Sequence, residues 1–131
     1  MDPADILFLM ARVFLSGVFL FSGIEKLFFW REGVEELKGF RLPFPALALA
    51  VTVAIQLGAG TMVLLGFYAR LGALALFAFT AAATLMGHRF WTMCGTAFRK
   101  SLTTALEHLA IMGGFLLIAA AGSGRFALSA L

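Results

Sequence analysis

Charge and cysteine are both scarce in this chain of 131 residues. Only 13% of the residues are charged, whereas soluble domains carry about 25%. The single cysteine, Cys94, cannot close a disulfide within the chain, which excludes thiol exchange by a cysteine pair. The ten Lys and Arg residues are dispersed and form no basic stripe interleaved with aromatic side chains. We therefore expect no nucleic acid partner.

Apolar residues, in contrast, are abundant. They make up 62% of the chain, against about 45–50% in soluble domains, and a soluble fold of this size could not bury them. The hydrocarbon core of a bilayer contains no water, so a chain that crosses it must satisfy its backbone hydrogen bonds internally. The composition therefore predicts an all-α integral membrane protein, with the lipid bilayer as its surroundings.

Four apolar stretches are long enough, at about 1.5 Å per residue, to cross the bilayer core as helices. The predicted spans are residues 6–29, 46–67, 71–87 and 103–122. We expect one four-helix transmembrane bundle over residues 1–131. The N-terminus lacks the basic region of a secretory signal, so we expect the first span to be retained.

The loops after the first and third predicted spans carry most of the basic residues. These are Lys26, Arg31, Lys38, Arg41, Arg89, Arg99 and Lys100, whereas the opposite side has Arg12, Arg70 and Arg125. Because loops rich in Lys and Arg stay in the cytoplasm, we predict these two loops inside and both termini outside. Trp30 and Trp91 follow the same two spans, where interfacial indoles sit. The charged stretch 30–44 predicts a short interfacial helix.

Polar side chains within the apolar spans mark candidate sites, because an ionised group costs about 2.5–3.5 kcal/mol at a helix centre. Glu25 stands near the end of the first span and either pairs with a nearby cation or belongs to a ligand site. Gln56 stands near the midplane in the second span, where its amide needs a partner helix or a ligand. The residues alone leave both alternatives open.

Three more polar residues are expected on the same side of the membrane as Glu25. His88 closes the third span, and Glu107 and His108 open the fourth. We predict a ligand pocket lined by Glu25, Gln56 and His108, with His88 and Glu107 at its rim.

The sequence contains no recognisable catalytic or cofactor motif, so its catalytic residues are unknown and we do not expect an enzyme by itself. A metal site built from His88, Cys94, Glu107 and His108 matches no compact zinc spacing, and no metal is expected. Arg12 stands about 9 Å from the start of the first span, close enough for its side chain to snorkel to the interface.

Small residues predict close contacts between helices, either within one bundle or between two copies of the chain. Ala78, Ala82 and the pair Gly113-Gly114 would let helix backbones approach. We therefore expect a homo-oligomer.

Short motifs along nearly the whole chain form a recognisable set. They are Arg12, Phe21-Ser22-Gly23-Ile24-Glu25-Lys26-Leu27, Pro43-Phe44-Pro45, Gln56-Leu57-Gly58-Ala59-Gly60, Arg70, His88-Arg89-Phe90-Trp91, His108-Leu109-Ala110-Ile111-Met112-Gly113-Gly114 and Gly122-Ser123-Gly124-Arg125. This set resembles the DoxX family of small bacterial membrane proteins, which implies a four-helix transmembrane fold. The chain departs from the family at Gln56, where an acidic residue is common, and at 127–131, which lack the usual Ser-Leu-Asp.

The resemblance also implies a function. Some relatives are named as subunits of thiosulfate:quinone oxidoreductases or as membrane anchors of oxidative-stress complexes. It therefore implies an inner-membrane subunit or scaffold for a redox or quinone-linked process, with quinone as the cofactor to test and a membrane or peripheral redox protein as partner. The alternative is a small proton-coupled transporter, in which Glu25 would exchange protons for a substrate.

Overall fold

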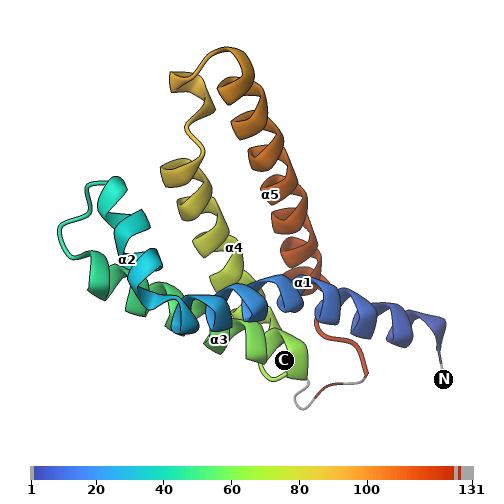
Figure 1. Cartoon of the computed structure of the whole chain (residues 1–131). Coiled ribbons are helices and arrows are strands. Elements are labelled where there is room, and N and C mark those ends of the chain that lie inside the picture. Colours follow the sequence, from blue (N-terminus) through green and yellow to red (C-terminus); the bar gives the residue numbers. More distant parts are fainter. Residues whose placement is uncertain (1, 126, 128–131) are drawn as a thin grey trace.

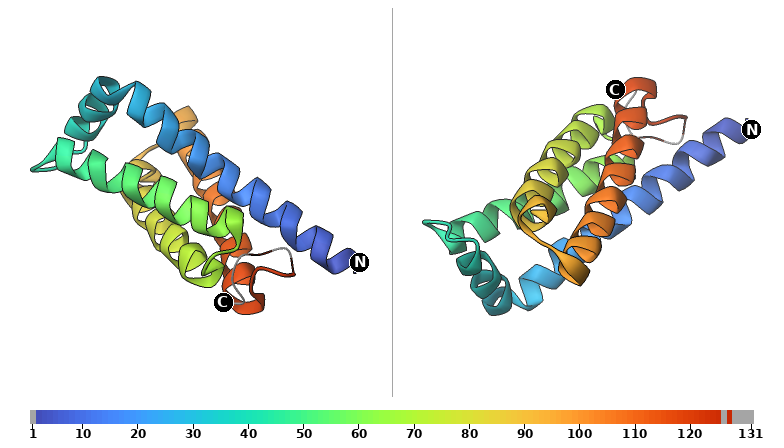
Figure 2. Two further views of the ribbon diagram at one scale, coloured as in Figure 1. Left: turned by 90° about the horizontal axis from the view of Figure 1, so that it is seen from below. Right: turned by 90° about the horizontal axis from the view of Figure 1, so that it is seen from above.

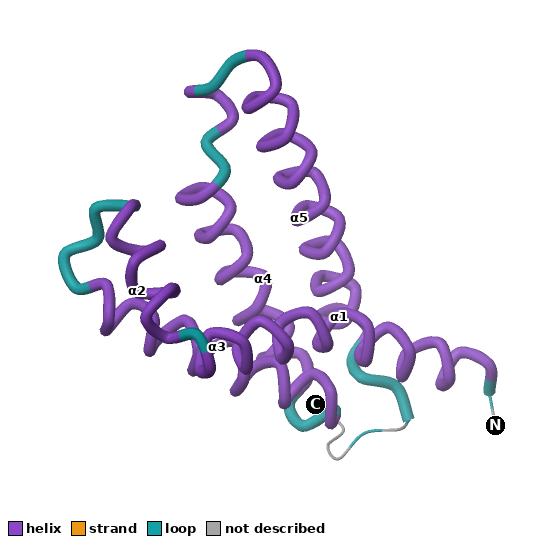
Figure 3. Tube along the Cα trace, in the orientation of Figure 1, coloured by secondary structure: helices purple, strands orange, loops and turns teal. Residues whose placement is uncertain are grey.

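The computed structural model describes residues 2–125 and 127, and most of these residues are helical (Figure 1). The helices are α1 (Pro3–Phe28), α2 (Trp30–Gly39), α3 (Pro45–Leu65), α4 (Ala69–Gly87), the short 3-10 helix η1 (Phe90–Thr92) and α5 (Gly95–Ala121). Within the described residues there is no strand (Figure 3). Four helices, α1, α3, α4 and α5, are long and apolar enough to cross a membrane, which confirms the predicted all-α membrane fold.

The helix ends differ from the predicted spans mainly at α5. This helix begins at Gly95, so most of the stretch 90–102 that was expected to be a loop is helical. Hydropathy locates the part of a helix that lies in lipid, and a helix can continue past that part into the interface. Arg99 and Lys100 lie in this extension, whose backbone bonds are satisfied within the helix. The sequence departure at 127–131 lies, except for residue 127, outside the described residues.

The ends of α1 and α3 follow from local chemistry. The Asp2 side chain accepts a hydrogen bond of 3.1 Å from the Ala4 amide, and Pro3 occupies the first turn, where its missing N–H is not needed. Helix α3 ends at Gly66, whose φ of 71° suits a residue without Cβ. Tyr68 is also left-handed, with φ 50°, and the chain turns back directly into α4.

The long helices pack as two pairs. Helix α1 lies along α3, α4 lies along α5, and the pairs meet mainly through α3 and α4, as the views in Figure 2 show. Figure 1 shows the pairs diverging toward the side of the molecule that carries α2 and η1. The hydrophobic core lies where the two helix pairs meet. The Phe19 and Phe115 rings pack edge to face there, with their centroids 5.4 Å apart.

Arg12 is fully buried, so the expectation that it snorkels to the interface is wrong. Its Nη1 donates hydrogen bonds to the carbonyl oxygens of Val63 (3.5 Å) and Leu64 (3.3 Å) in the last turn of α3. Carbonyls in the last turn of a helix lack the usual amide partner four residues on, and they form the negative end of its dipole. The Val63 carbonyl also accepts from the Gly66 amide at 3.3 Å. Gly66 leaves the space for the guanidinium, since a Cβ there would collide with Nη1. A cation from α1 thus caps the end of α3.

Candidate functional site

A cavity of about 740 Å³ lies between the helix pairs, on the side where they diverge. We call it the large cavity. Side chains from α1, α2, α3, α4 and α5 line it, together with the loop between α2 and α3. Most of its wall is apolar, including Phe19, Phe40, Phe44, Phe79, Leu47 and Met86. The polar residues in the wall are Ser22, Lys26, Glu36, Thr52, Gln56, Thr80, His88 and His108.

Gln56 is the most buried of the predicted site residues. Its side chain is only 5% exposed, and its Oε1 atom has no hydrogen-bond partner among the residues that the structure describes. An amide buried in an apolar bundle without a partner costs about 1–3 kcal/mol. This residue is therefore the strongest sign that the site takes a further hydrogen-bonding group.

His108 is held in place by α4. Its Nδ1 lies 2.8 Å from the Thr84 hydroxyl oxygen, and that hydroxyl donates to the Thr80 carbonyl at 2.7 Å. In the tautomer that carries its proton on Nδ1, His108 donates to the Thr84 oxygen, and its Nε2 keeps a lone pair. His108 can accordingly accept a hydrogen bond from a ligand.

The two histidines are neighbours. The His88 and His108 rings contact edge to face with centroids 5.3 Å apart. Within the described part of the chain, no group of three His, Cys, Asp or Glu residues lies close enough together to hold a metal ion.

The structure brings together three of the five predicted site residues. Gln56, His88 and His108 line the large cavity, whereas Glu25 and Glu107 do not, and both carboxylates are exposed. The reason is helical phase, because consecutive residues are rotated by about 100° around a helix. Glu25 precedes Lys26 and Glu107 precedes His108, and in each pair the second residue is the one that faces the cavity.

The sequence analysis did not predict the other polar residues that line the large cavity, which are Ser22, Lys26, Glu36, Thr52 and Thr80. Thr80 of α4 was missed, although Thr80, Thr84 and the C-cap residue His88 recur at intervals of four residues and so share one helix face. The same spacing relates Thr52 to Gln56 on α3 and Ser22 to Lys26 on α1. Polar residues four apart within apolar spans were the available signal. Glu36 gave no such signal, because it belongs to α2, a helix with many charges and no buried residue.

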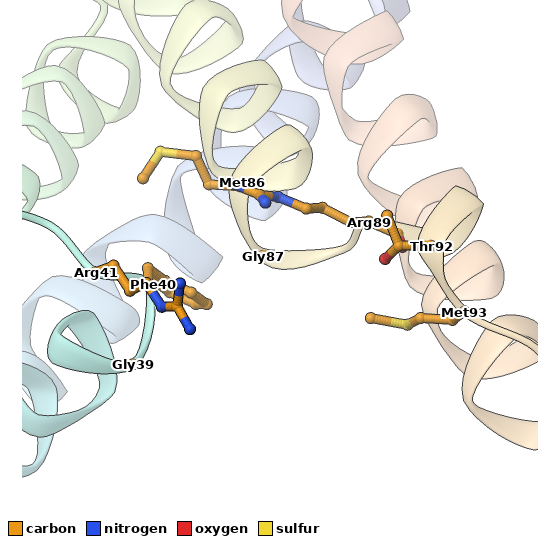
Figure 4. Close-up of a pocket in the computed structure, with 8 residues that line it drawn as sticks. All are labelled: Gly39, Phe40, Arg41, Met86, Gly87, Arg89, Thr92 and Met93. Carbon is orange, nitrogen blue, oxygen red and sulfur yellow. The ribbon is translucent and has the colours of Figure 1, made fainter.

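A second, smaller hollow of about 330 Å³ opens beside the large cavity (Figure 4). We call it the basic cleft. It is lined by Gly39, Phe40, Arg41, Met86, Gly87, Arg89, Thr92 and Met93. The two hollows share Phe40, Met86 and Gly87, so they adjoin.

The fold and the cavity define a class: a small four-helix membrane protein with a polar-lined cavity between its helix pairs. Comparison with known proteins gives the family. A DoxX family model matches residues 7–89, and the chain belongs to the DoxX family. The match covers α1 to α4 almost completely, with Gln56 and His88, and it ends before α5.

A curated relative extends the similarity to nearly the whole chain. The chain is 28% identical over 123 residues to "Inner membrane protein YphA" of Escherichia coli (strain K12). The alignment covers 94% of this chain and 88% of the relative. No solved structure shows a significant match.

Proposed function

We propose that the protein is an inner-membrane subunit or scaffold that holds a quinone in the large cavity and so supports a redox process carried out with a partner protein. The observation that supports this most directly is the cavity itself. Its volume of about 740 Å³ lies within the range of about 300–1,000 Å³ typical of small-molecule sites. Its wall is mainly apolar, with a few convergent polar groups, as such sites require.

The chemistry of the wall suits both redox forms of a quinone. The phenylalanine rings of the wall offer apolar contacts to a flat ring. The NH2 group of the Gln56 amide can donate to a quinone carbonyl. Gln56 Oε1, unpaired among the described residues, and Nε2 of His108 can accept from quinol hydroxyls. The lining carries no redox group of its own, so a partner protein would supply or take up the electrons.

Localisation and assembly follow the same proposal. The curated relative is named an inner membrane protein, and we place this chain in the bacterial inner membrane by similarity. Ala78 and Gly113 are exposed in this single chain, so these two small residues are not used up within the bundle, whereas Ala82 lines the large cavity and Gly114 packs on Leu15. Ala78 and Gly113 leave close helix contacts available to a second copy, which supports a homo-oligomer.

Quinone binding can be tested by titrating the detergent-purified protein with a short-chain benzoquinone in a calorimeter. Gln56→Met and His108→Leu should each weaken binding roughly tenfold, the effect of losing about 1.4 kcal/mol of hydrogen bonding. Glu25→Gln and Glu107→Gln are matched controls, because both carboxylates lie outside the cavity. Wild-type protein that takes up no quinone, or equal losses in all four variants, would refute the proposed site.

The transporter alternative depends on Glu25. The structure gives it no specific support, because the Glu25 side chain is exposed and lies outside the large cavity. Uptake driven by a pH gradient in proteoliposomes, abolished by Glu25→Gln, would favour transport over the scaffold.

A further inference from the structure

We propose that the basic cleft binds the phosphate group of an anionic phospholipid, with Arg41 and Arg89 as its ligands. This inference goes beyond the proposed function and does not depend on whether a quinone occupies the large cavity. It rests on the charge of the cleft, on its backbone geometry and on its position in the fold.

The charge comes first. Arg41 follows α2 and Arg89 follows α4, so two separate elements bring two cations to one cleft. Among the described residues, neither the Arg41 nor the Arg89 guanidinium forms a salt bridge or a side-chain hydrogen bond. The ion pair among these residues joins Lys38 to Glu35 at 3.1 Å, outside the cleft. No carboxylate lines the cleft. Its positive charge is therefore not neutralised within the described chain, and an anion is the complementary ligand.

The backbone of both arginines is fixed while their side chains are free. Arg41 adopts φ 59°, a left-handed conformation that is uncommon for a residue with a Cβ, and its amide donates to the Lys38 carbonyl at 3.0 Å. Non-glycine residues held in this region cost about 1–3 kcal/mol and cluster at binding sites. The Arg89 carbonyl accepts from the Thr92 hydroxyl at 2.7 Å and from the Thr92 amide at 3.0 Å.

Both arginine side chains line the cleft. Figure 4 shows Arg89 extending from the end of α4 toward the side of the cleft that carries Arg41. Guanidinium groups present a planar set of donors that matches phosphate oxygens in a bidentate manner. An oxyanion between two such groups would receive several charge-assisted hydrogen bonds, which a spherical halide could not match in geometry.

The location of the basic cleft at the membrane interface favours a lipid as the source of the phosphate. The cleft lies at the end of the membrane helix α4, beside Trp91 of η1, where helices meet the headgroup layer. Phe40, Met86 and Met93 give it apolar walls next to the arginines, as the boundary between headgroup and acyl chain requires. Basic pockets at helix ends on the cytoplasmic side bind anionic headgroups in other membrane proteins.

The test compares the protein in nanodiscs of phosphatidylglycerol with the protein in nanodiscs of phosphatidylcholine. Native mass spectrometry counts retained lipids, and thermal unfolding measures the stability that each lipid gives. The wild-type protein should retain phosphatidylglycerol and unfold at a higher temperature in that lipid than in phosphatidylcholine. The double variant Arg41→Gly/Arg89→Gln should reduce this retention by roughly an order of magnitude, as expected from the loss of two interfacial cations.

A second double variant, Arg99→Gln/Lys100→Gln, removes the same charge from α5 outside the cleft and should retain the lipid. Glycine at position 41 suits the left-handed backbone, so the cleft variant should remain folded. Equal losses in both double variants would overturn the proposal, because the effect would then be diffuse surface charge. So would equal retention of the two lipids by the wild-type protein.

One further arm separates the sources of phosphate. The wild-type protein in phosphatidylcholine nanodiscs is titrated with glycerol phosphate. No change in its unfolding temperature supports the lipid as ligand. A rise as large as that given by phosphatidylglycerol, and lost in the cleft variant, would overturn the lipid assignment and identify a soluble phosphate ester instead.

Discussion

Nδ1 of His108 lies 2.8 Å from the hydroxyl oxygen of Thr84, and this hydrogen bond joins α5 to α4 at the wall of the large cavity. The Thr84 hydroxyl in turn donates to the Thr80 carbonyl, so α4 holds the imidazole ring in one orientation. Thr84 does not line the cavity itself. It acts as a positioning residue for the one that does.

The Thr84 to His108 bond can be measured by a double-mutant cycle. We expect Thr84→Val and His108→Leu to be non-additive by about 0.6 kcal/mol, the mean for hydrogen bonds between membrane helices. Thr61→Val is the control, because the Thr61 hydroxyl bonds only the Leu57 carbonyl of its own helix. The readout is unfolding in mixed micelles, and strict additivity of the two substitutions would contradict a hydrogen bond between these side chains.

The amide oxygen of Gln56, unpaired within the described chain, should lower the stability of the ligand-free protein and strengthen the binding of a ligand that donates a hydrogen bond to it. Replacing it by methionine, a side chain of similar length, removes a buried carbonyl oxygen that has no partner among the described residues. We expect Gln56→Met to leave the free energy of unfolding unchanged or to raise it by up to about 1–3 kcal/mol. A thermal melt of the ligand-free protein checks this. A clear drop in stability would show that the amide has a structural role.

Arg12 should stabilise the pairing of α1 with α3. Arg12→Met removes the hydrogen bonds to the last carbonyls of α3, and we expect a loss of about 1.5–3 kcal/mol, the usual range for bonds to a charged group. Arg31→Met is the matched control, because Arg31 is exposed on α2. Comparable unfolding temperatures for the two variants would argue against a capping role.

Gly72 should tolerate no side chain. A Cβ at this position of α4 would lie 3.0 Å from the backbone carbonyl oxygen of Ala59 on α3, an atom that cannot rotate away. We expect Gly72→Ala to cost about 1–3 kcal/mol through overpacking. Gly113→Ala meets nothing within 4 Å, and it should be neutral or gain up to about 1 kcal/mol of helix propensity. Thermal melts of the two alanine variants, run side by side, give the comparison.

Membrane orientation can be tested with the native cysteine. Cys94 is exposed in the loop between α4 and α5, which we predict to be cytoplasmic. In intact spheroplasts, a membrane-impermeant maleimide should leave Cys94 unlabelled and should label Arg125→Cys in a Cys94→Ser background, since Arg125 is exposed beyond α5. The opposite labelling pattern would invert the topology.

The fold was largely predictable because a bilayer imposes few choices on an apolar stretch. Hydropathy located the four spans, and charge clustering indicated the helix that became α2. Contacts between helices could not be predicted from the sequence in the same way. Arg12 looked like a snorkelling residue because nothing local reveals that the end of α3 lies beside it. Glu25 and Glu107 were predicted at the site from their depth in the membrane alone. In the structure they lie outside the large cavity, because the rotation of each helix about its axis turns these side chains away from it.

The cap that α1 provides for α3 also constrains biosynthesis. An arginine at the centre of a span opposes insertion by about 2.5–3.5 kcal/mol, and Arg12 lies off the centre of α1, where the cost is smaller. The carbonyls that receive Arg12 belong to Val63 and Leu64, so they leave the ribosome more than 50 residues later. The hydrogen-bond acceptors of Arg12 therefore exist only when α3 has been made. Helices α1 and α3 can then enter the lipid as one preassembled pair before α4 and α5 are complete.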